Sequence, residues 1–264
     1  MKLGFIGGGN MGSAMMGGII AGGLCDKKDV MVSDTFQDSL DRLSADLGIN
    51  TTTDNKAVVE FADIIFLAIK PQMLADVVEE IKTLDFSNKL VVSIVAGQSI
   101  EKILGLFGKK LKLVRVMPNT PALVGEGMAG LSPNELVSDE EAELVKKLFE
   151  SFGKAEIVPE KLQDAVCGIS GSSPAYVFMF IEAMADGAVA EGMPRAQAYK
   201  FAAQAVLGSA KMVLETGKHP GELKDAVCSP GGTTIEAVAA LEQAGFRSAV
   251  IDAERICIDK SRSL

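Results

Sequence analysis

The chain has 264 residues, of which 48% are hydrophobic and 23% are charged, and its formal net charge is −9. This composition is typical of a packed globular protein, and the length favours two domains. The negative charge would repel a phosphate backbone, so nucleic acid is not an expected partner.

Membrane and metal roles are also disfavoured. No apolar run reaches the roughly 20 residues that span a bilayer, and the most apolar helix candidate, residues 175–193, contains three acidic residues. The four cysteines form no C-x-x-C pair, which predicts free thiols in a reducing compartment and suggests neither a metal site nor a redox dithiol. Glycines follow residues 1–6 where a signal peptide would continue with apolar residues. We therefore expect a cytoplasmic protein.

Short apolar runs alternate with helical stretches over residues 1–160. The predicted strands cover residues 2–6, 30–33, 64–69, 90–95 and 113–117, with a weaker pair at 128–131 and 155–158. Runs that are apolar on both faces fit strands covered by helices on each side. The pattern predicts an α/β fold, with an N-terminal Rossmann-type, doubly wound and mostly parallel sheet.

Two helices in this part carry start signals. Pro71 stands at a first-turn position before a helix predicted over residues 73–81. Ser138 is followed by Glu141 three residues later, which predicts a capping box at the start of a helix over residues 139–149.

Residues 161–264 form a second predicted domain, which is all-helical. Long Ala-rich stretches cover residues 174–191, 194–215 and 245–260, each bounded by Pro or Gly. Residues 176–181 are apolar around the whole helix and must be buried on all sides. Because a domain of about 100 residues has little core of its own, we expect these helices to pack against a second copy in a homodimer.

A glycine motif follows the first predicted strand. Gly7, Gly9 and Gly12 form G-x-G-x-x-G before a helix, a context in which the glycines allow a tight turn and bring the backbone close to a pyrophosphate. Asp34 ends the next strand, 22 residues after Gly12, where a carboxylate binds the adenosine ribose hydroxyls. The alternative is a purely structural glycine turn.

Asp34 also bears on the choice of cofactor. Its charge would repel the 2′-phosphate of NADP, and Thr35, Phe36 and Ser39 supply no cation to hold that phosphate. The pattern therefore favours NAD modestly over NADP, although Asn55 or Lys56 on the next helix remains within possible reach of the phosphate.

Three other strand ends carry unusual residues, and ligands of such sheets bind at these ends. Lys70-Pro71-Gln72 follows one strand, with a solvated lysine and a cofactor contact as equal alternatives. Ala96-Gly97 follows another, either as a simple turn or as small residues that admit the nicotinamide ring. Asn119-Thr120 stands between prolines, where a rigid turn is the alternative to a binding role.

The C-terminal half contains Ser229-Pro230-Gly231-Gly232-Thr233-Thr234 before a helix. Free backbone N–H groups and the positive end of the helix dipole suit a small carboxylate, while an ordinary helix start is the alternative.

This stretch closely resembles the Ser-Pro-Gly-Gly-x-Thr signature of pyrroline-5-carboxylate reductases. The resemblance takes in residues 5–12, 68–71, 117–122 and 168–176 and covers nearly the whole chain. It implies an enzyme that reduces 1-pyrroline-5-carboxylate to L-proline with NAD(P)H, and a helical dimerisation domain that assembles as a homodimer or a ring of dimers.

The resemblance also assigns residues. It implies that the substrate carboxylate and ring nitrogen are bound by Ser229, Gly231, Gly232, Thr233 and Thr234. It also implies that the cofactor is contacted by Ile6, Gly7, Gly8, Gly9, Asn10, Met11, Asn55, Ala68, Ile69, Lys70, Pro71, Ala96 and Gly97. NADPH-preferring members often carry Arg or Lys after the second strand, whereas this chain has Asp34-Thr35.

The single histidine, His219, lies in a turn-like context, so the general base of a hydroxy-acid dehydrogenase has no obvious candidate. Hydride addition to a protonated imine needs no such base, and Thr234 is the expected catalytic hydrogen-bonding partner of the ring nitrogen. Two alternatives remain. A β-hydroxyacid dehydrogenase would place a lysine on the helix over residues 174–191, which has none. A non-catalytic dinucleotide-sensing regulator would use the same fold.

Overall fold

The computed structural model describes residues 1–263, and its contacts divide the chain into two compact units. The first unit comprises Met1–Ser172 and the chain from Cys257 onward, and the second comprises Ser173–Ile256. The predicted boundary after residue 160 separates a cofactor-binding domain from a substrate-binding domain, and it stays a prediction.

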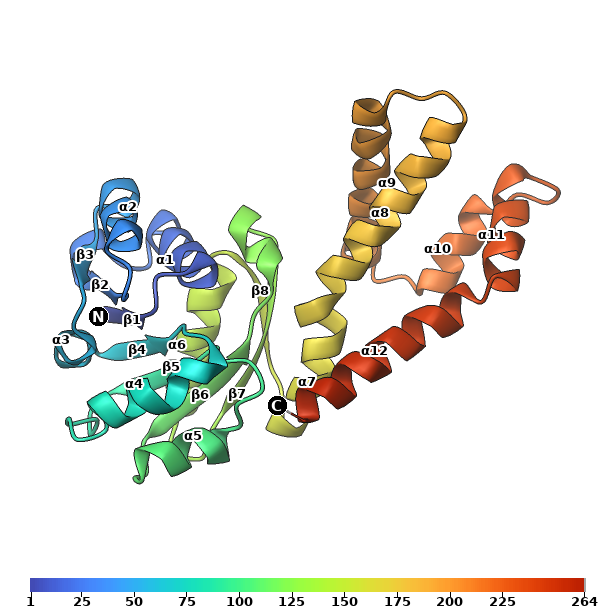
Figure 1. Cartoon of the computed structure of the whole chain (residues 1–264). Helices are drawn as coiled ribbons and strands as arrows, with labels where there is room; N and C mark the ends of the chain where they lie inside the picture. The colour runs from blue at the N-terminus through green and yellow to red at the C-terminus, as the bar shows by residue number, and fades with distance from the viewer. Residues whose placement is uncertain (264) are drawn as a thin grey trace. The chain divides into compact units, whose positions relative to one another are not determined.

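The first unit is built on one eight-stranded sheet (Figure 1). Its strands are β1 (Leu3–Ile6), β2 (Val30–Ser33), β3 (Asn50–Thr52), β4 (Ile64–Leu67), β5 (Leu90–Ser93), β6 (Lys112–Met117), β7 (Gly127–Pro133) and β8 (Gly153–Ile157). They lie in the order β3-β2-β1-β4-β5-β6-β7-β8, and only the β6–β7 pair is antiparallel. The chain changes direction across the sheet between β1 and β4. Such a switch point leaves a crevice at the carboxyl ends of these two strands.

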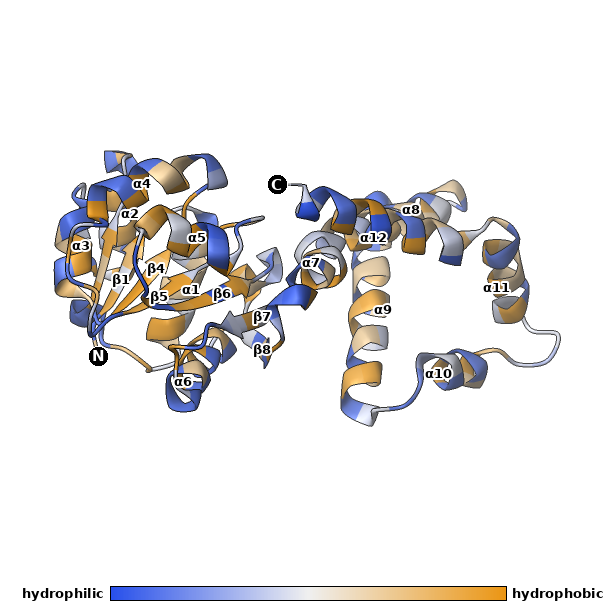
Figure 2. Cartoon of the chain, turned by 90° about the horizontal axis from the view of Figure 1, so that it is seen from below, coloured by the Kyte–Doolittle hydropathy of each residue, from blue (hydrophilic) through white to orange (hydrophobic). Residues whose placement is uncertain are grey.

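Helices cover both faces of this sheet, as the sequence predicts. They are α1 (Asn10–Ala21), α2 (Gln37–Leu47), α3 (Asn55–Phe61), α4 (Leu74–Ile81), α5 (Ile100–Phe107) and α6 (Asp139–Glu150). One apolar core joins α1, α2 and α6 to one face, and a second joins α3, α4 and α5 to the other. Alternate residues of the central strands enter the two cores: Phe5 and Phe66 stack on one side, while Ile6 and Leu67 pack on the other. Figure 2 shows the apolar strands within this unit.

Most element boundaries agree with the sequence-based ones. Ser138 and Glu141 form the predicted capping box, and a 3₁₀ turn, η2 (Pro71–Met73), precedes α4. Two strands are shorter than predicted, because β4 ends at Leu67 and β5 at Ser93, so Ala68-Ile69 belong to the following turn. The edge strand β3 was missed, because its residues Asn50-Thr51-Thr52 carry no apolar signal.

A short helical stretch ends the first unit. After η3 (Thr120–Val124) and η4 (Glu160–Leu162), α7 (Gln163–Val166) continues directly into a π-helical turn, η5 (Cys167–Ser172). Single π-helical turns are rare and often occur near functional sites.

The second unit is entirely helical. It contains α8 (Ser173–Ala190), α9 (Arg195–Thr216), α10 (Pro220–Val227), α11 (Thr233–Gln243) and the first part of α12 (Phe246–Arg262). Gly192, at a φ of +95°, turns the chain between α8 and α9, and small residues, Ala185, Ala198 and Ala202, are buried on these helices.

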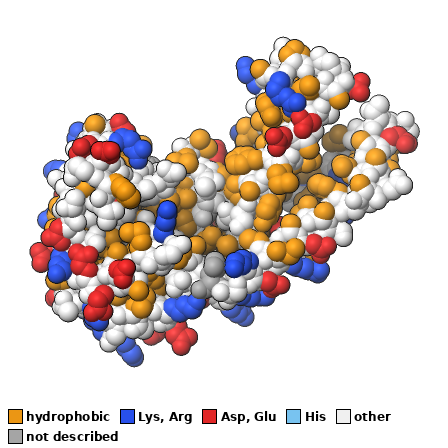
Figure 3. Space-filling model, viewed as in Figure 1, with side chains coloured by type: hydrophobic (Ala, Val, Ile, Leu, Met, Phe, Trp, Pro, Cys, Tyr) orange, Lys and Arg blue, Asp and Glu red, His pale blue; other side chains and the backbone are white. Residues whose placement is uncertain are grey.

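Within the single chain, residues 176–181 are not buried on all sides, and their expected cover by a second copy stays a prediction. Phe178 is 62% exposed and Met179 is 69% exposed, and further large apolar side chains are exposed on α9 and α12. Figure 3 shows hydrophobic side chains gathered along these helices. Large exposed apolar patches mark interaction sites or ligand-binding grooves. None of the described helices is long and apolar enough to span a membrane.

Candidate functional site

The glycine turn lies at the carboxyl end of β1, beside the end of β4. Gly7 has a φ of +105°, and a Cβ on it would lie 2.3 Å from the Ala68 carbonyl oxygen. A Cβ on Gly12 would lie 2.5 Å from the Gly7 carbonyl oxygen. Because both positions exclude any side chain, the turn requires glycine for the close packing of β1, α1 and the β4 exit.

Gly9 differs from its neighbours, because a Cβ there would meet nothing within 4 Å. It is the N-cap residue of α1, its side is open, and no side chain caps the helix. The first turn of α1 contains no acidic residue. Unpaired N–H groups at an open helix start can bind a pyrophosphate, and open space over Gly9 lets that group approach the backbone.

Asp34 follows β2 and fastens the glycine turn. One carboxylate oxygen accepts the Gly8 N–H at 2.8 Å, and the other accepts the Phe36 N–H at 3.0 Å. The Ser13 and Ser39 hydroxyls both donate to the Gly8 carbonyl oxygen, at 3.0 and 3.3 Å. A carboxylate has about four acceptor positions, so Asp34 keeps capacity for ribose hydroxyls while it holds the turn.

The sequence interpretation considered Phe36 only as a residue that offers no cation. Its side chain is 73% exposed, and it is the N-cap residue of α2, two residues beyond Asp34. The other exposed aromatic side chains among the described residues, such as Phe178 and Phe201, belong to the second unit. An aromatic residue directly after the second strand of a dinucleotide fold was the signal available in the sequence.

The remaining predicted cofactor residues lie at neighbouring strand ends. Asn55 accepts the Ser33 hydroxyl at 2.7 Å and donates to Glu80 at 2.8 Å, which joins the end of β2 to α4. Lys70 is exposed and precedes η2. Ala96-Gly97 follows β5, where Gly97 has a φ of +70°. The sheet thus brings the glycine turn, Asp34, residues 68–71 and Ala96-Gly97 to one edge.

The Ser229 loop, residues 229–232, lies in the second unit and leads into α11. The Gly232 N–H donates to the Ser229 carbonyl at 3.0 Å, and Gly231 has a φ of +64° after Pro230. These are the features of a type II turn, with Pro and Gly in the two central positions. A Cβ on Gly232 would lie 2.4 Å from Ser229 Oγ, so this position also requires glycine.

The two threonines are the first residues of α11. Gly232 is the N-cap residue and no side chain caps the helix, so the N–H groups of its first turn remain available for an anion. Thr234 is half-buried and Thr233 is exposed. Glu236 also lies in this first turn, where its negative charge suits the helix dipole but competes with a bound anion for the helix start. The loop can hold a small carboxylate through backbone N–H groups and hydroxyls.

Comparisons with known proteins agree along the whole chain. A family model described as pyrroline-5-carboxylate reductase dimerisation matches residues 160–264, and one described as NADP oxidoreductase, coenzyme F420-dependent, matches residues 2–97. The pyrroline-5-carboxylate reductase of Escherichia coli strain K12 is 54% identical over 263 residues, covering 100% of this chain and 98% of that protein. The chain belongs to the pyrroline-5-carboxylate reductase family.

Other members of the family support the assignment. The enzyme of Methanosarcina acetivorans is 47% identical and is covered over 97% of its length. The structure of the Coxiella burnetii reductase superposes with a TM-score of 0.92 at 35% identity, covering 99% of this chain and 97% of that one. That of the Plasmodium falciparum reductase, described with NADP bound, gives 0.90 at 34% identity, covering 100% and 97%.

Two conspicuous polar residues of this family member have structural tasks. Asn119 is 8% exposed, its amide donates to the Ser170 carbonyl at 3.0 Å, and its side-chain oxygen accepts the Met128 N–H at 2.8 Å. This geometry favours the rigid-turn alternative. His219 is the N-cap residue of α10, and its Nδ1 accepts the Gly221 N–H at 3.0 Å. The one imidazole of this reductase sequence is therefore engaged in a helix cap.

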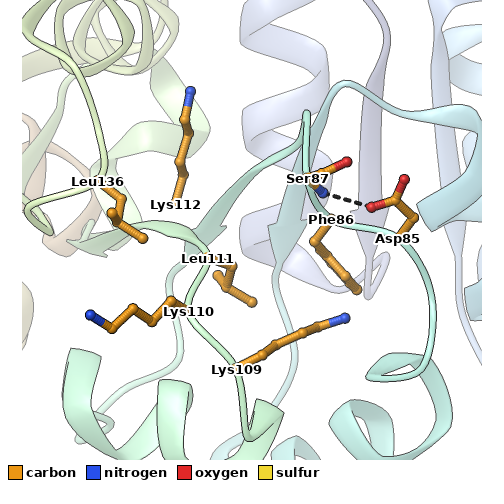
Figure 4. Close-up of a pocket in the computed structure, with 8 residues that line it drawn as sticks. All are labelled: Asp85, Phe86, Ser87, Lys109, Lys110, Leu111, Lys112 and Leu136. Carbon is orange, nitrogen blue, oxygen red and sulfur yellow. Dashed lines mark hydrogen bonds between the residues drawn. The ribbon is translucent and has the colours of Figure 1, made fainter.

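A pocket of about 380 Å³ lies away from the sheet edge that carries the glycine turn and Asp34 (Figure 4). It is lined by Lys109, Lys110 and Lys112 next to Asp85 and Phe86, where β6 begins. Lys109 Nζ donates to the Leu84 carbonyl at 2.7 Å, and Lys112 pairs with Glu141 at 2.6 Å. Because it lies at the opposite end of the strands and two of its ammonium groups have partners, it is not the family's dinucleotide site.

Proposed function

We propose that this chain reduces 1-pyrroline-5-carboxylate to L-proline, the last step of proline biosynthesis, with hydride from a nicotinamide dinucleotide. The observation that carries the proposal is the presence in one chain of an open glycine turn and a Ser-Pro-Gly-Gly-Thr-Thr anion loop. Relatives at 54% and 47% identity over the full length are named for this reaction.

The first unit binds the cofactor in this proposal. The open backbone at Gly9 and the uncapped start of α1 receive the pyrophosphate, and Asp34 receives the ribose. The small residues Ala96-Gly97 leave room for the nicotinamide ring, and Lys70 lies beside the phosphates. The bound dinucleotide supplies the hydride, and the residues of this chain orient and hold it.

The second unit binds the substrate. The Ser229 hydroxyl and the N–H groups at the start of α11 hold the carboxylate, with hydrogen bonds to a charged group worth about 1.5–3 kcal/mol each. The Thr234 hydroxyl hydrogen-bonds the ring nitrogen. Since the protonated imine already carries its proton, hydride addition requires orientation and no general base. The engagement of His219 in a helix cap fits this mechanism.

We propose NADH as the preferred reductant. The Asp34 carboxylate, which is proposed to bind the ribose, would repel a 2′-phosphate on it, and neither Thr35 nor Phe36 offers a cation. The names of a matching family model and of one solved relative refer to NADP, so NADPH is the alternative. The exposed ring of Phe36 provides an apolar surface for the adenine, next to the carboxylate that binds its ribose.

We further propose a homodimer, or a ring of such dimers, formed through the apolar surface of α8 and α9. Exposed Phe178, Met179 and Phe201 support it, as does the dimerisation family model over residues 160–264. The four unpaired cysteines support a reducing compartment such as the cytoplasm.

An absorbance assay tests the reaction. Purified protein is mixed with NADH or NADPH, and oxidation is followed before and after addition of pyrroline-5-carboxylate. The proposal requires oxidation that depends on the imine, with one L-proline formed per dinucleotide. Binding of the dinucleotide without turnover would instead favour the regulator, and oxidation of NADH only with a β-keto acid would favour the dehydrogenase.

A further inference from the structure

The chain passes between its two units twice, and the two passages lie side by side in the first unit. The outgoing passage is η5, which ends at Ser172, and the returning passage starts at Cys257 on α12. Cys257 Sγ donates to Ser172 Oγ at 3.1 Å, and Ser261 Oγ donates to Asp164 Oδ1 at 2.8 Å. Both views of the chain show the end of α12 beside α7 (Figures 1 and 2).

Cys167 lies between these two hydrogen bonds. On the outgoing side, Asp164 stands three residues before it and Ser172 five residues after it, one turn away in each direction. On α12, Cys257 and Ser261 are four residues apart and share a face. Cys167 therefore faces α12.

The surroundings of the Cys167 thiol agree with this position. Its sulfur lies 3.8 Å from the place that a Cβ on Gly171 would occupy, next to Ser172. Burial raises the pKa of this thiol, and the side chains that act on it electrostatically are those of Ser261, Cys257 and Ser172. Both cysteines are half-buried and unpaired, so they are within reach of a small oxidant.

We propose that Cys167 and Cys257 form an oxidisable dithiol site, which a peroxide converts to an intrachain disulfide between the two passages. In the first step, one thiol loses its proton and its sulfur attacks the peroxide. The O–O bond breaks, and the leaving hydroxide takes up that proton, so that a sulfenic acid and one water form. In the second step, the other thiol attacks the sulfenic sulfur, the S–S bond forms, and a second water leaves. The two cysteines together lose two electrons, and these reduce the peroxide.

The other two cysteines have different surroundings. Cys25 lies near the start of the chain, with its sulfur 3.6 Å from the Met1 carbonyl oxygen. Cys228 belongs to the second unit, between α10 and the Ser229 loop. The disulfide of the Cys167–Cys257 site would close a loop that contains the whole second unit and would tie its two ends together.

Mass spectrometry tests this proposal without reference to catalysis. The protein is treated with hydrogen peroxide in slight excess, quenched with an alkylating agent and digested. We expect an intact mass lower by two hydrogens and a linked peptide pair that contains Cys167 and Cys257. Dithiothreitol should reverse both changes.

Two pairs of variants provide matched controls. The mass loss should persist in the Cys25→Ser, Cys228→Ser double variant and disappear in Cys167→Ser and in Cys257→Ser. Peptide mapping of the wild-type chain decides the question even where a variant fails to fold. Sulfinic acids on these cysteines without a linked peptide, or a linkage that involves Cys25 or Cys228, would overturn the proposal.

Discussion

The carboxylate of Asp34 accepts the backbone N–H of Gly8 at 2.8 Å and so ties the end of β2 to the turn after β1. This contact joins residues 26 positions apart, and it gives Asp34 a structural task besides its proposed contact with the ribose. Replacement of Asp34 would disturb the turn and the cofactor preference together. A test of the preference should therefore leave Asp34 in place and change its neighbour.

The variant Thr35→Arg introduces a cation without loss of the Asp34 contacts. Its guanidinium can form a charge-assisted pair with a 2′-phosphate, so we expect kcat/KM with NADPH to rise about tenfold, equivalent to about 1.4 kcal/mol. The value with NADH should change little. Steady-state kinetics with both cofactors measure the ratio, and Thr35→Gln is the uncharged control. An unchanged ratio would argue against a 2′-phosphate position near residue 35.

Loss of the Phe36 ring should weaken binding of the adenosine half of the cofactor. Stacking of a base on an aromatic side chain is worth about 1–3 kcal/mol, so Phe36→Ala should raise the KM for NADH at least fivefold. Reduced nicotinamide mononucleotide lacks adenosine, and its KM should not change. Phe36→Tyr should behave as the wild type. Equal effects on both reductants would show that Phe36 acts on the fold instead.

Thr234 is the residue proposed to contact the ring nitrogen. Loss of its hydroxyl in Thr234→Ala should lower kcat/KM for pyrroline-5-carboxylate by about ten- to a hundredfold. The affinity for NADH, measured by fluorescence titration, should stay nearly unchanged. Thr234→Ser keeps the hydroxyl and should recover most of the activity. Full activity of the alanine variant would remove Thr234 from the mechanism.

The exposed apolar surface of α8 should hold two chains together. Phe178 is 62% exposed in the single chain, and burial of a side chain of this size contributes about 1.5–3 kcal/mol. Phe178→Glu should therefore sediment as a monomer at micromolar concentration. Val124, an exposed apolar residue of the first unit, provides the control, because Val124→Glu should keep the wild-type sedimentation. A wild-type monomer would contradict the proposed dimer.

The ionised carboxylate of Glu141, in the capping box of α6, should make the stability of the fold depend on pH. The ammonium group of Lys112 at 2.6 Å, followed by the Ser138 N–H, holds the pKa of Glu141 below its ordinary value near 4.5. Because the folded-state pKa is depressed, this stabilisation is present above about pH 4.5 and is lost as pH falls through the folded-state value. Glu141→Gln should lower Tm at neutral pH, and the difference should shrink in acid. Glu143→Gln, on the exposed side of α6, should show no such trend.

The regular part of the fold could be predicted because its signals are local. Buried strands such as β4 are continuous apolar runs, and the Ser138 cap has its partner three residues away. The short polar strand β3 gives no such signal, since only its pairing with β2 defines it. The apolar circumference of α8 was recognised, but in a single chain those residues stay exposed.

The motifs of the candidate site could be predicted from the sequence, whereas the hydrogen bonds between residues distant in sequence could not. Three of the glycines that accept no Cβ, Gly7, Gly12 and Gly232, belong to the two sequence motifs, whereas Gly153 excludes a side chain without belonging to any such motif. The Asp34–Gly8 bond and the task of Asn119 join residues distant in sequence, so no local pattern contains them. Phe36 was passed over because exposure of an aromatic ring is a property of the folded surface.

The proposed reaction depends on direct transfer of hydride from the dinucleotide to the imine carbon. Reduced dinucleotide with deuterium on the transferred position of the nicotinamide, incubated with the protein and pyrroline-5-carboxylate, tests it by nuclear magnetic resonance of the product. We expect L-proline with one deuterium, on the ring carbon that was doubly bonded to nitrogen. Proline without deuterium, or no proline at all, would contradict it.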